Sequence, residues 1–205
     1  NRKNLGHSNS LASDMATSHF GTWTIWEVEA MVFVECFADF TETGGQYIDE
    51  IKFVEDSAKR DPRIRGIVPM APLEWGVRVK PMLTDMRDNH PSVKGIRRIM
   101  EFDDDPRGLT LSPGFIEGVN LLREFGWHFE INVNFTQMDI IREFVQHIPD
   151  VPMILDHCGK PGIKEGALAQ YRDDIRDLEL IDYKVRILNG GTEAVTRVLI
   201  DSIDA

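Results

Sequence analysis

The chain has 205 residues, 42% of them hydrophobic, which is enough to bury one sizeable core, and we expect one domain over residues 28–205 after an irregular arm at 1–27. Its 34 acidic and 23 basic residues leave a net charge of -11, which repels phosphate backbones and anionic lipids and argues against nucleic acid or membrane partners. No stretch approaches the roughly 20 apolar residues that cross a bilayer, the first residues lack the apolar core of a secretory signal, and the two cysteines suit reduced thiols, so we expect a cytoplasmic protein.

Short apolar runs alternate with longer stretches of helical periodicity along the chain, a pattern that predicts βα units around a parallel sheet. Strands are expected at residues 30–36, 64–73, 93–100, 128–135, 153–156 and 184–188, with a degraded strand at 22–26. Helices are expected at residues 46–60, 79–86, 113–125, 137–147, 166–180 and 192–203. Ser112 and Pro113 suit the N-cap and first residue of the third helix, and Gly126 suits its end. The acidic stretch at 101–111 is expected to be a solvated loop.

The fold class that this pattern predicts is α/β with a parallel sheet. Strand starts about 25 to 35 residues apart fit either a TIM-type (β/α) barrel or an open doubly wound sheet. The glycine patterns that cradle nucleotide phosphates are absent from the sequence. The spacing alone therefore leaves both architectures open.

Side chains at the carboxyl ends of parallel strands share one crevice, so catalytic groups are expected there. His157 follows a continuous apolar run and could ligate a metal or act as a general base, although a packed histidine bonded to a backbone carbonyl is the commoner case. Cys158 follows it directly, but neighbours on an extended chain point apart, so a catalytic Cys–His dyad is not expected.

Two consecutive arginines occupy the end of the third predicted strand, so only one of them can face into a barrel. Arg97 or Arg98 would suit a substrate carboxylate or a developing oxyanion, and the equally plausible alternative is an ion pair with Glu35, Glu101 or Asp156. A carboxylate that ends an apolar strand, as Glu35 does, must be paired, bound to metal or exposed, and pairing with arginine is the commonest case.

Two asparagines stand two residues apart near the end of the fourth predicted strand. Asn132 and Asn134 would share one strand face, where their amides could bind substrate hydroxyl groups. Polar residues at the edge of a strand, without a role in binding, explain this pattern equally well. We retain both residues, with Glu35, as candidate substrate contacts.

Several segments together resemble a known family: VEAMVFVEC, DPRIRGIVPMAPLE, VKGIRRIM, GVNLLREFGWHFEINV and above all MILDHCGKPGI. They are similar to the TIM-barrel metal-dependent hydrolases of the amidohydrolase superfamily, in particular to the branch with sugar-acid lactonases and pyrone-dicarboxylate lactonase. The resemblance implies a hydrolase that opens a lactone ring by attack of water on the carbonyl. It also implies that His157 projects into the site, where it assists proton transfer or binds the metal, and that Arg97 or Arg98 lies near the substrate.

The sequence also departs from that family at both ends. The H-x-H pair of the first strand and the S-D-W-P-like aspartate of the last strand are not found, and six clear units fall short of the eight of a barrel. We therefore expect a barrel whose two end units are lost or altered. Zinc or manganese is the implied metal, but a catalytic zinc takes about three protein ligands and His157 would supply one. Uncovered sheet edges favour a homo-oligomer. The alternative to a hydrolase is a non-catalytic binding or assembly subunit.

Overall fold

The computed structural model describes residues 28–36, 46–180 and 185–188. The predicted arm at 1–27, its strand at 22–26 and the predicted helix at 192–203 lie outside these residues. In the described part, no helix combines the length and the apolar character that a membrane span requires.

Parallel strands alternate with helices throughout the described residues. The strands are β1 (Met31–Val34), β2 (Ile64–Val68), β3 (Gly95–Ile99), β4 (His128–Asn132), β5 (Met153–Asp156) and β6 (Val185–Leu188). The helices are α2 (Gln46–Ala58), α3 (Lys80–Asn89), α4 (Pro106–Thr110), α5 (Pro113–Phe125), α6 (Met138–Phe144) and α7 (Leu168–Leu180). Short 3-10 segments are η1 (Leu73–Val79), η2 (Phe135–Gln137), η3 (Val145–His147) and η4 (His157–Gly159).

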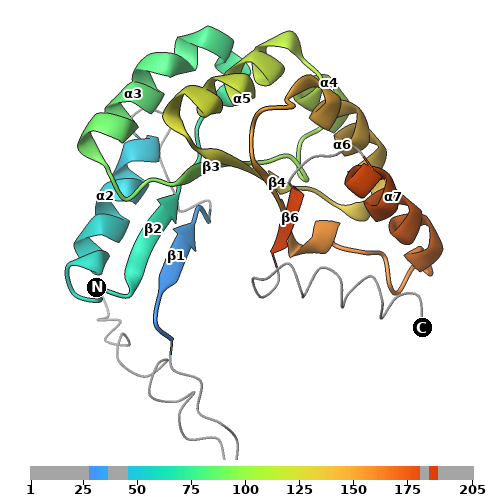
Figure 1. Cartoon of the computed structure of the whole chain (residues 1–205), viewed down its shortest axis with the longest axis horizontal. Coiled ribbons are helices and arrows are strands. Elements are labelled where there is room, and N and C mark those ends of the chain that lie inside the picture. Colours follow the sequence, from blue (N-terminus) through green and yellow to red (C-terminus); the bar gives the residue numbers. More distant parts are fainter. Residues whose placement is uncertain (1–27, 37–45, 181–184, 189–205) are drawn as a thin grey trace, which may run out of the picture.

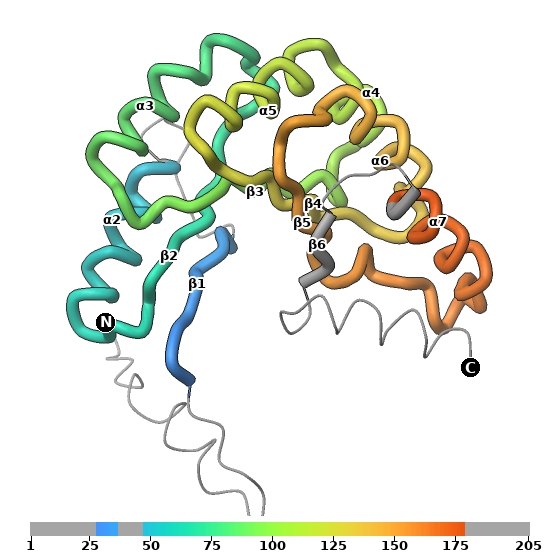
Figure 2. Tube along the Cα trace, in the orientation of Figure 1, coloured from blue at the N-terminus to red at the C-terminus, as the bar shows by residue number. Residues whose placement is uncertain are grey.

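The strands are adjacent in chain order and parallel. β1 pairs with β2, and β3 to β6 form a second ladder in sequence order. Two isolated parallel bridges connect the two ladders: Ile67 of β2 with Val93, which precedes β3, and Met70, which follows β2, with Arg97 of β3. In Figure 1 the helices line the outside of an arch and the strands run along its inner side. Figure 2 shows β1 and β2 on one side of this arch and α7 on the other. Consecutive order with helices on one side fits a (β/α) barrel rather than a doubly wound sheet, which has a reversal of strand order.

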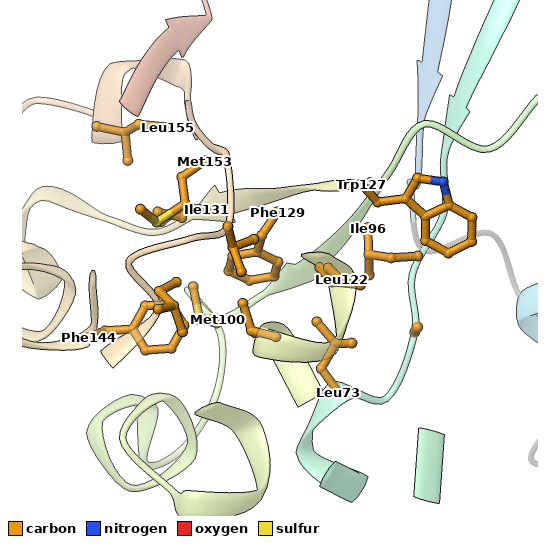
Figure 3. Packing of buried hydrophobic residues seen from close by; sticks show 14 of the residues in the cluster. Leu73, Ile96, Met100, Leu122, Trp127, Phe129, Ile131, Phe144, Met153 and Leu155 are labelled. Atoms are coloured by element: carbon orange, nitrogen blue, oxygen red, sulfur yellow. The ribbon is translucent and has the colours of Figure 1, made fainter. Parts of the chain in front are cut away.

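The hydrophobic core lies between the strands and the helices. Phe129 of β4 packs edge-to-face against Phe115 of α5 and Phe144 of α6, with ring centroids 5.8 and 6.1 Å apart. Ile96 of β3 and Leu155 of β5 join the same fully buried cluster (Figure 3). Because side chains alternate along a strand, the residues next to these in sequence point to the inner face of the sheet. The core thereby determines which polar residues share that inner face.

The local signals around α5 are confirmed, whereas the acidic loop differs from its prediction. The Ser112 hydroxyl accepts a hydrogen bond of 3.2 Å from the Phe115 amide, and Gly126 ends the helix in the left-handed conformation. Within the stretch expected to be a loop, α4 forms, and the Asp105 carboxylate caps it by accepting 2.8 Å from the Gly108 amide. Aspartate followed by proline is itself a helix-start signal, so the acidic composition misled the prediction.

Candidate functional site

Arg97 is the centre of a buried network on the inner face of the sheet. Its Nε donates to Glu35 Oε1 at 3.1 Å, its Nη1 donates to Asp156 Oδ2 at 2.9 Å, and its Nη2 donates to the Glu35 carbonyl oxygen. These bonds join Glu35, just after β1, to the middle of β3 and to the last residue of β5. Only Arg97, of the two consecutive arginines, faces inward, as the strand period requires.

Burial and pairing act in opposite directions on this guanidinium. Burial lowers the pKa of Arg97, but its bonds to Asp156 and Glu35 outweigh burial and hold the pKa above its ordinary value. Glu35 is 1% exposed and Asp156 is 5% exposed, so Arg97 replaces water as the hydrogen-bond donor to each carboxylate. The expected pairing of Glu35 with an arginine is confirmed, and Arg97 has both carboxylates as partners.

The network continues across β4 to the segment that follows β5. The Asn132 amide nitrogen donates to Asp156 Oδ2 at 3.4 Å, and Lys160 Nζ donates to Asn132 Oδ1 at 3.5 Å. Lys160 also forms an ion pair with Glu101, in the loop after β3. Asn132, which the sequence predicted as a substrate contact, thus lies inside the network. Lys160 and Glu101 extend the network to the loops that follow β5 and β3.

His157 stands on an unusual backbone turn. His157, Cys158, Gly159 and Lys160 all have positive φ, at 50°, 54°, 67° and 49°. Left-handed backbone costs a residue with a Cβ about 1–2 kcal/mol, so the surroundings must hold the turn. The Tyr171 hydroxyl of α7 does so by donating 2.6 Å to the buried Cys158 carbonyl.

The turn exposes the His157 side chain and buries that of Cys158. The expectation of an extended chain at these two residues was therefore wrong, because the strand ends at Asp156 and the chain turns at once. Within the part of the chain that the structure describes, the His157 imidazole forms no hydrogen bond or ion pair and is exposed to solvent at the carboxyl end of β5.

Arg98 points to the side of β3 opposite to Arg97 and forms a separate polar cluster with Glu74 and Asp103. Its Nε lies 3.6 Å from Glu74 Oε1, and its Nη2 donates to Asp103 Oδ1 at 3.4 Å. Three buried polar atoms of this cluster, Glu74 Oε2, Asp103 Oδ2 and Arg98 Nε, have no hydrogen-bond partner in the described residues. The structure therefore does not bring Arg97 and Arg98 into one group.

Asn134 does not share the strand face of Asn132, because β4 ends at Asn132. The Asn134 side chain instead caps η2 by accepting 3.2 Å from the Thr136 amide, while its own amide donates to the Gln137 side chain at 2.8 Å. Asparagine offers the backbone such local bonds in competition with a strand ladder. The prediction of a strand as far as residue 135 was too long for this reason.

Two buried carboxyl groups were not predicted from the sequence. Glu130, 2% exposed on β4, bonds to His128 Nε2 at 3.1 Å through Oε1, and its Oε2 has no partner among the described residues. His128 lies over Gly95, where a Cβ would come within 2.5 Å of its ring. The signal was available, because Glu130 precedes Asn132 by the strand period of two.

Glu50 of α2 is the second overlooked carboxyl group, and it is 4% exposed. It accepts a hydrogen bond of 3.4 Å from the Cys36 amide. Burial raises the pKa of Glu50, and the negative charge of Glu35 raises it further. A carboxyl group on a helix was not a strand-end candidate, and its inward position depends on how α2 packs beside β2.

The described residues do not form a complete metal site. Among them, no three histidine, cysteine, aspartate or glutamate side chains are grouped as metal ligands. The carboxylates nearest the centre, Glu35 and Asp156, are already paired with Arg97. The donor set of the described part therefore does not fit a bound divalent cation, and His157 alone remains as a candidate ligand.

Comparison with known proteins identifies the family. The family model described as Amidohydrolase matches residues 33–184. An amidohydrolase from Burkholderia multivorans with bound zinc has a similar fold, with a TM-score of 0.64 at 23% identity over 78% of this chain and 52% of that one. An amidohydrolase from the same organism with bound HEPES has a TM-score of 0.65 at 22% identity, over 85% and 62% of the two chains. No curated protein matches the chain.

Amidohydrolase 2 from Bifidobacterium longum subsp. infantis is similar at a TM-score of 0.54 and 21% identity, over 85% of this chain and 61% of that one. The chain therefore spans about half to three fifths of the length of these three proteins. The family model covers most of the described residues, and the consecutive parallel strands agree with it. The chain belongs to the amidohydrolase family.

Proposed function

We propose that the chain is a hydrolase that opens the lactone ring of a small sugar-acid substrate. The observation that carries the proposal is the position of His157. It lies on a left-handed turn that Tyr171 holds by a hydrogen bond, and this turn exposes its side chain to solvent at the carboxyl end of β5. Membership of a hydrolase family supports the reaction type, and the carboxyl end is where (β/α) barrels hold their active sites. No described contact favours the alternative of a non-catalytic subunit.

In the proposed reaction, water attacks the carbonyl carbon and the bond to the ring oxygen breaks. His157 takes a proton from the water and returns it to the ring oxygen, which leaves as a hydroxyl group. The products are then a carboxylic acid and an alcohol on one molecule. A histidine suits this task because its charge changes near neutral pH.

The other candidates receive roles that follow from their contacts. Arg97 acts as a positioning residue, because its donors are occupied by Glu35 and Asp156, and Asp156 directly precedes the turn that holds His157. Asn132 and the Arg98 cluster are the groups that we propose to contact the substrate. Asn134, whose side chain caps η2, would hold the loop that follows β4 in place.

Metal dependence is part of the proposal but no step is assigned to a metal. The similar Burkholderia multivorans protein has bound zinc, and zinc or manganese is the metal that we propose to test here. Since the described residues lack a grouped set of metal ligands, the proton transfer is assigned to His157 alone.

The test is acid release from a panel of aldonolactones at neutral pH, without metal and with zinc or manganese. His157→Asn is the informative variant, since asparagine tolerates the left-handed backbone that alanine would strain. His147→Asn is the matched control, because His147 is also exposed but lies on η3, on the segment that leads into β5 rather than out of it.

We expect the first variant to lose at least about a hundredfold in kcat, the usual contribution of a general base, and the control to keep full activity. Equal turnover in His157→Asn and the parent chain would contradict the role of His157. Absence of turnover under every metal condition would refute the lactonase proposal.

A further inference from the structure

Lys160 and His157 occupy the same face of the turn that follows β5. The Lys160 amide donates 2.9 Å to the His157 carbonyl oxygen, and all residues of this turn share the left-handed conformation. A 3-10 turn repeats every three residues and rises about 2 Å per residue, so these two side chains lie one above the other, about 6 Å apart along its axis. The residues between them face the core, since Cys158 is buried and a Cβ at Gly159 would lie 3.0 Å from the Met138 sulfur.

The Lys160 side chain reaches across the carboxyl end of β4 to the loop after β3. Its ammonium forms an ion pair with Glu101 of that loop, and it donates 3.5 Å to Oδ1 of Asn132, the last residue of β4. Asn132 in turn donates to Asp156 in the buried network on the inner face of the sheet. The ammonium therefore lies beside that network, at the same end of the strands as the turn that carries His157.

Three cations lie at the strand ends of the described residues, and Lys160 is the most exposed of them. Its side chain is 32% exposed, against 10% for Arg97 and 13% for Arg98. An ammonium has three N–H donors, and two of those of Lys160 have acceptors in the described part of the chain, on Glu101 and Asn132. One donor can therefore bind a ligand while the ion pair stays intact, whereas Arg97 would first have to give up a buried carboxylate.

Phe102 also contacts this ammonium. The centroid of its ring lies 5.8 Å from Lys160 Nζ, and the face of an aromatic ring attracts a cation. Glu101, Asn132 and Phe102 thus hold the ammonium in one position before a ligand arrives. A donor that is held in place in advance is what stabilisation of a developing negative charge requires.

We propose that Lys160 is the catalytic residue that stabilises the oxyanion, which rests on the proposed lactone hydrolysis and adds a second group to His157. When water adds to the carbonyl carbon, the π electron pair moves onto the carbonyl oxygen, and Lys160 donates a hydrogen bond to that oxygen while keeping its own proton. The carbonyl then re-forms as the bond to the ring oxygen breaks. The electron pair of this bond leaves on the ring oxygen, which takes the proton that His157 holds.

The test compares two six-membered rings that are not turned over. A cyclic phosphonate monoester has a negatively charged tetrahedral centre like that of the oxyanion, whereas δ-valerolactam is neutral and keeps a planar carbonyl group. Isothermal titration calorimetry measures both at neutral pH. Lys160→Met removes the ammonium at nearly constant length, and we expect it to weaken phosphonate binding at least about tenfold and lactam binding by less than about threefold.

The partner of Lys160 distinguishes a binding role from a structural one. If the ion pair only held the loop, Lys160→Met and Glu101→Gln would weaken phosphonate binding alike. If the ammonium binds the oxyanion, Glu101→Gln should tighten phosphonate binding, because it removes a competing negative charge. The double variant Lys160→Met and Glu101→Gln leaves neither charge unpaired and should still bind phosphonate weakly. Lys59→Met, which breaks an exposed pair after α2, is the control.

Kinetics provide a second readout. In lactone hydrolysis, Lys160→Met should lower kcat by about a hundredfold to a thousandfold, the usual effect of losing one oxyanion donor, with little change in KM. Lys160→Arg should recover part of this loss, because it keeps the positive charge. Circular dichroism of each variant checks that the fold is retained.

The outcomes separate this inference from the proposed function. Equal phosphonate affinities of Lys160→Met and the parent chain, equal losses in Lys160→Met and Glu101→Gln, or no phosphonate binding by the parent chain would each overturn the inference. Phosphonate binding that depends on Lys160, without hydrolysis of any lactone, would overturn the proposed function and leave the anion-binding role of Lys160 standing. Hydrolysis that His157→Asn abolishes and Lys160→Met leaves unchanged would do the reverse.

Discussion

Arg97→Met offers the most direct test of the buried network. The substitution keeps an unbranched side chain of similar length but removes both ion pairs, to Glu35 at 3.1 Å and to Asp156 at 2.9 Å. Because these carboxylates are 1% and 5% exposed, water cannot readily replace the guanidinium. The variant therefore leaves two buried negative charges facing each other.

The expected loss is large for a single substitution. Removing one partner from a buried ion pair costs about 3–5 kcal/mol in the free energy of unfolding. In a chain of this size each kcal/mol lowers Tm by about 2–4 °C, so the expected decrease is about 6–20 °C. Lys59→Met, which breaks an exposed pair with Asp56 on α2, should leave Tm unchanged.

Urea unfolding followed by tryptophan fluorescence measures the loss, and a compensated variant tests its cause. If uncompensated charge is responsible, Glu35→Gln and Asp156→Asn added to Arg97→Met should restore part of the lost stability, since a buried neutral amide costs less than a buried unpaired carboxylate. A loss below about 1 kcal/mol in the single variant, or no recovery in the triple variant, would refute the argument.

Two further predictions concern the supports of the site. Burial, and secondarily the neighbouring Cys158, raises the pKa of Tyr171 above its usual value of 10.0, so its stabilising contribution is complete below about pH 10 and is lost at higher pH. Tyr171→Phe should cost about 1–3 kcal/mol at neutral pH and abolish this alkaline dependence in unfolding experiments; an unchanged alkaline slope would contradict it. A Cβ at Gly118 would lie 2.0 Å from the Leu73 carbonyl oxygen. Gly118→Ala should therefore lower stability by about 1–3 kcal/mol, whereas exposed Arg123→Ala should change it little, and equal melting temperatures would refute the clash.

Much of the fold was predictable because its signals are local. The alternation of apolar runs and helical stretches predicted each described strand, and β5 at Met153–Asp156 has the predicted bounds. Ser112 and Gly126 predicted the ends of α5, because capping depends on residues within one turn. The overlong strand prediction at residue 135 and the missed α4 both reflect side chains that bond to the nearby backbone.

The candidate site was predictable only as a set of strand ends. Strand polarity indicated Glu35, Arg97 and His157, and the alternation of side chains indicated that Arg97 and Arg98 could not act together. The sequence offered Glu35, Glu101 and Asp156 as partners of an arginine, but it did not show which of them Arg97 binds. Arg97 stands 62 residues from Glu35 and 59 from Asp156 in the chain. Glu130 was missed although the strand period places it on the face of Asn132, whereas Glu50 was missed because its burial depends on how a neighbouring helix packs.

The sequence by itself therefore determined the βα alternation, the helix caps and the polar strand ends, all of which follow from periodicities and bonds within a few residues. Only the tertiary structure decided that Arg97 is committed to two carboxylates and that His157 sits on a left-handed turn held by α7. Those features arise when the register of parallel strands brings distant residues together and burial then requires every charge to find a partner.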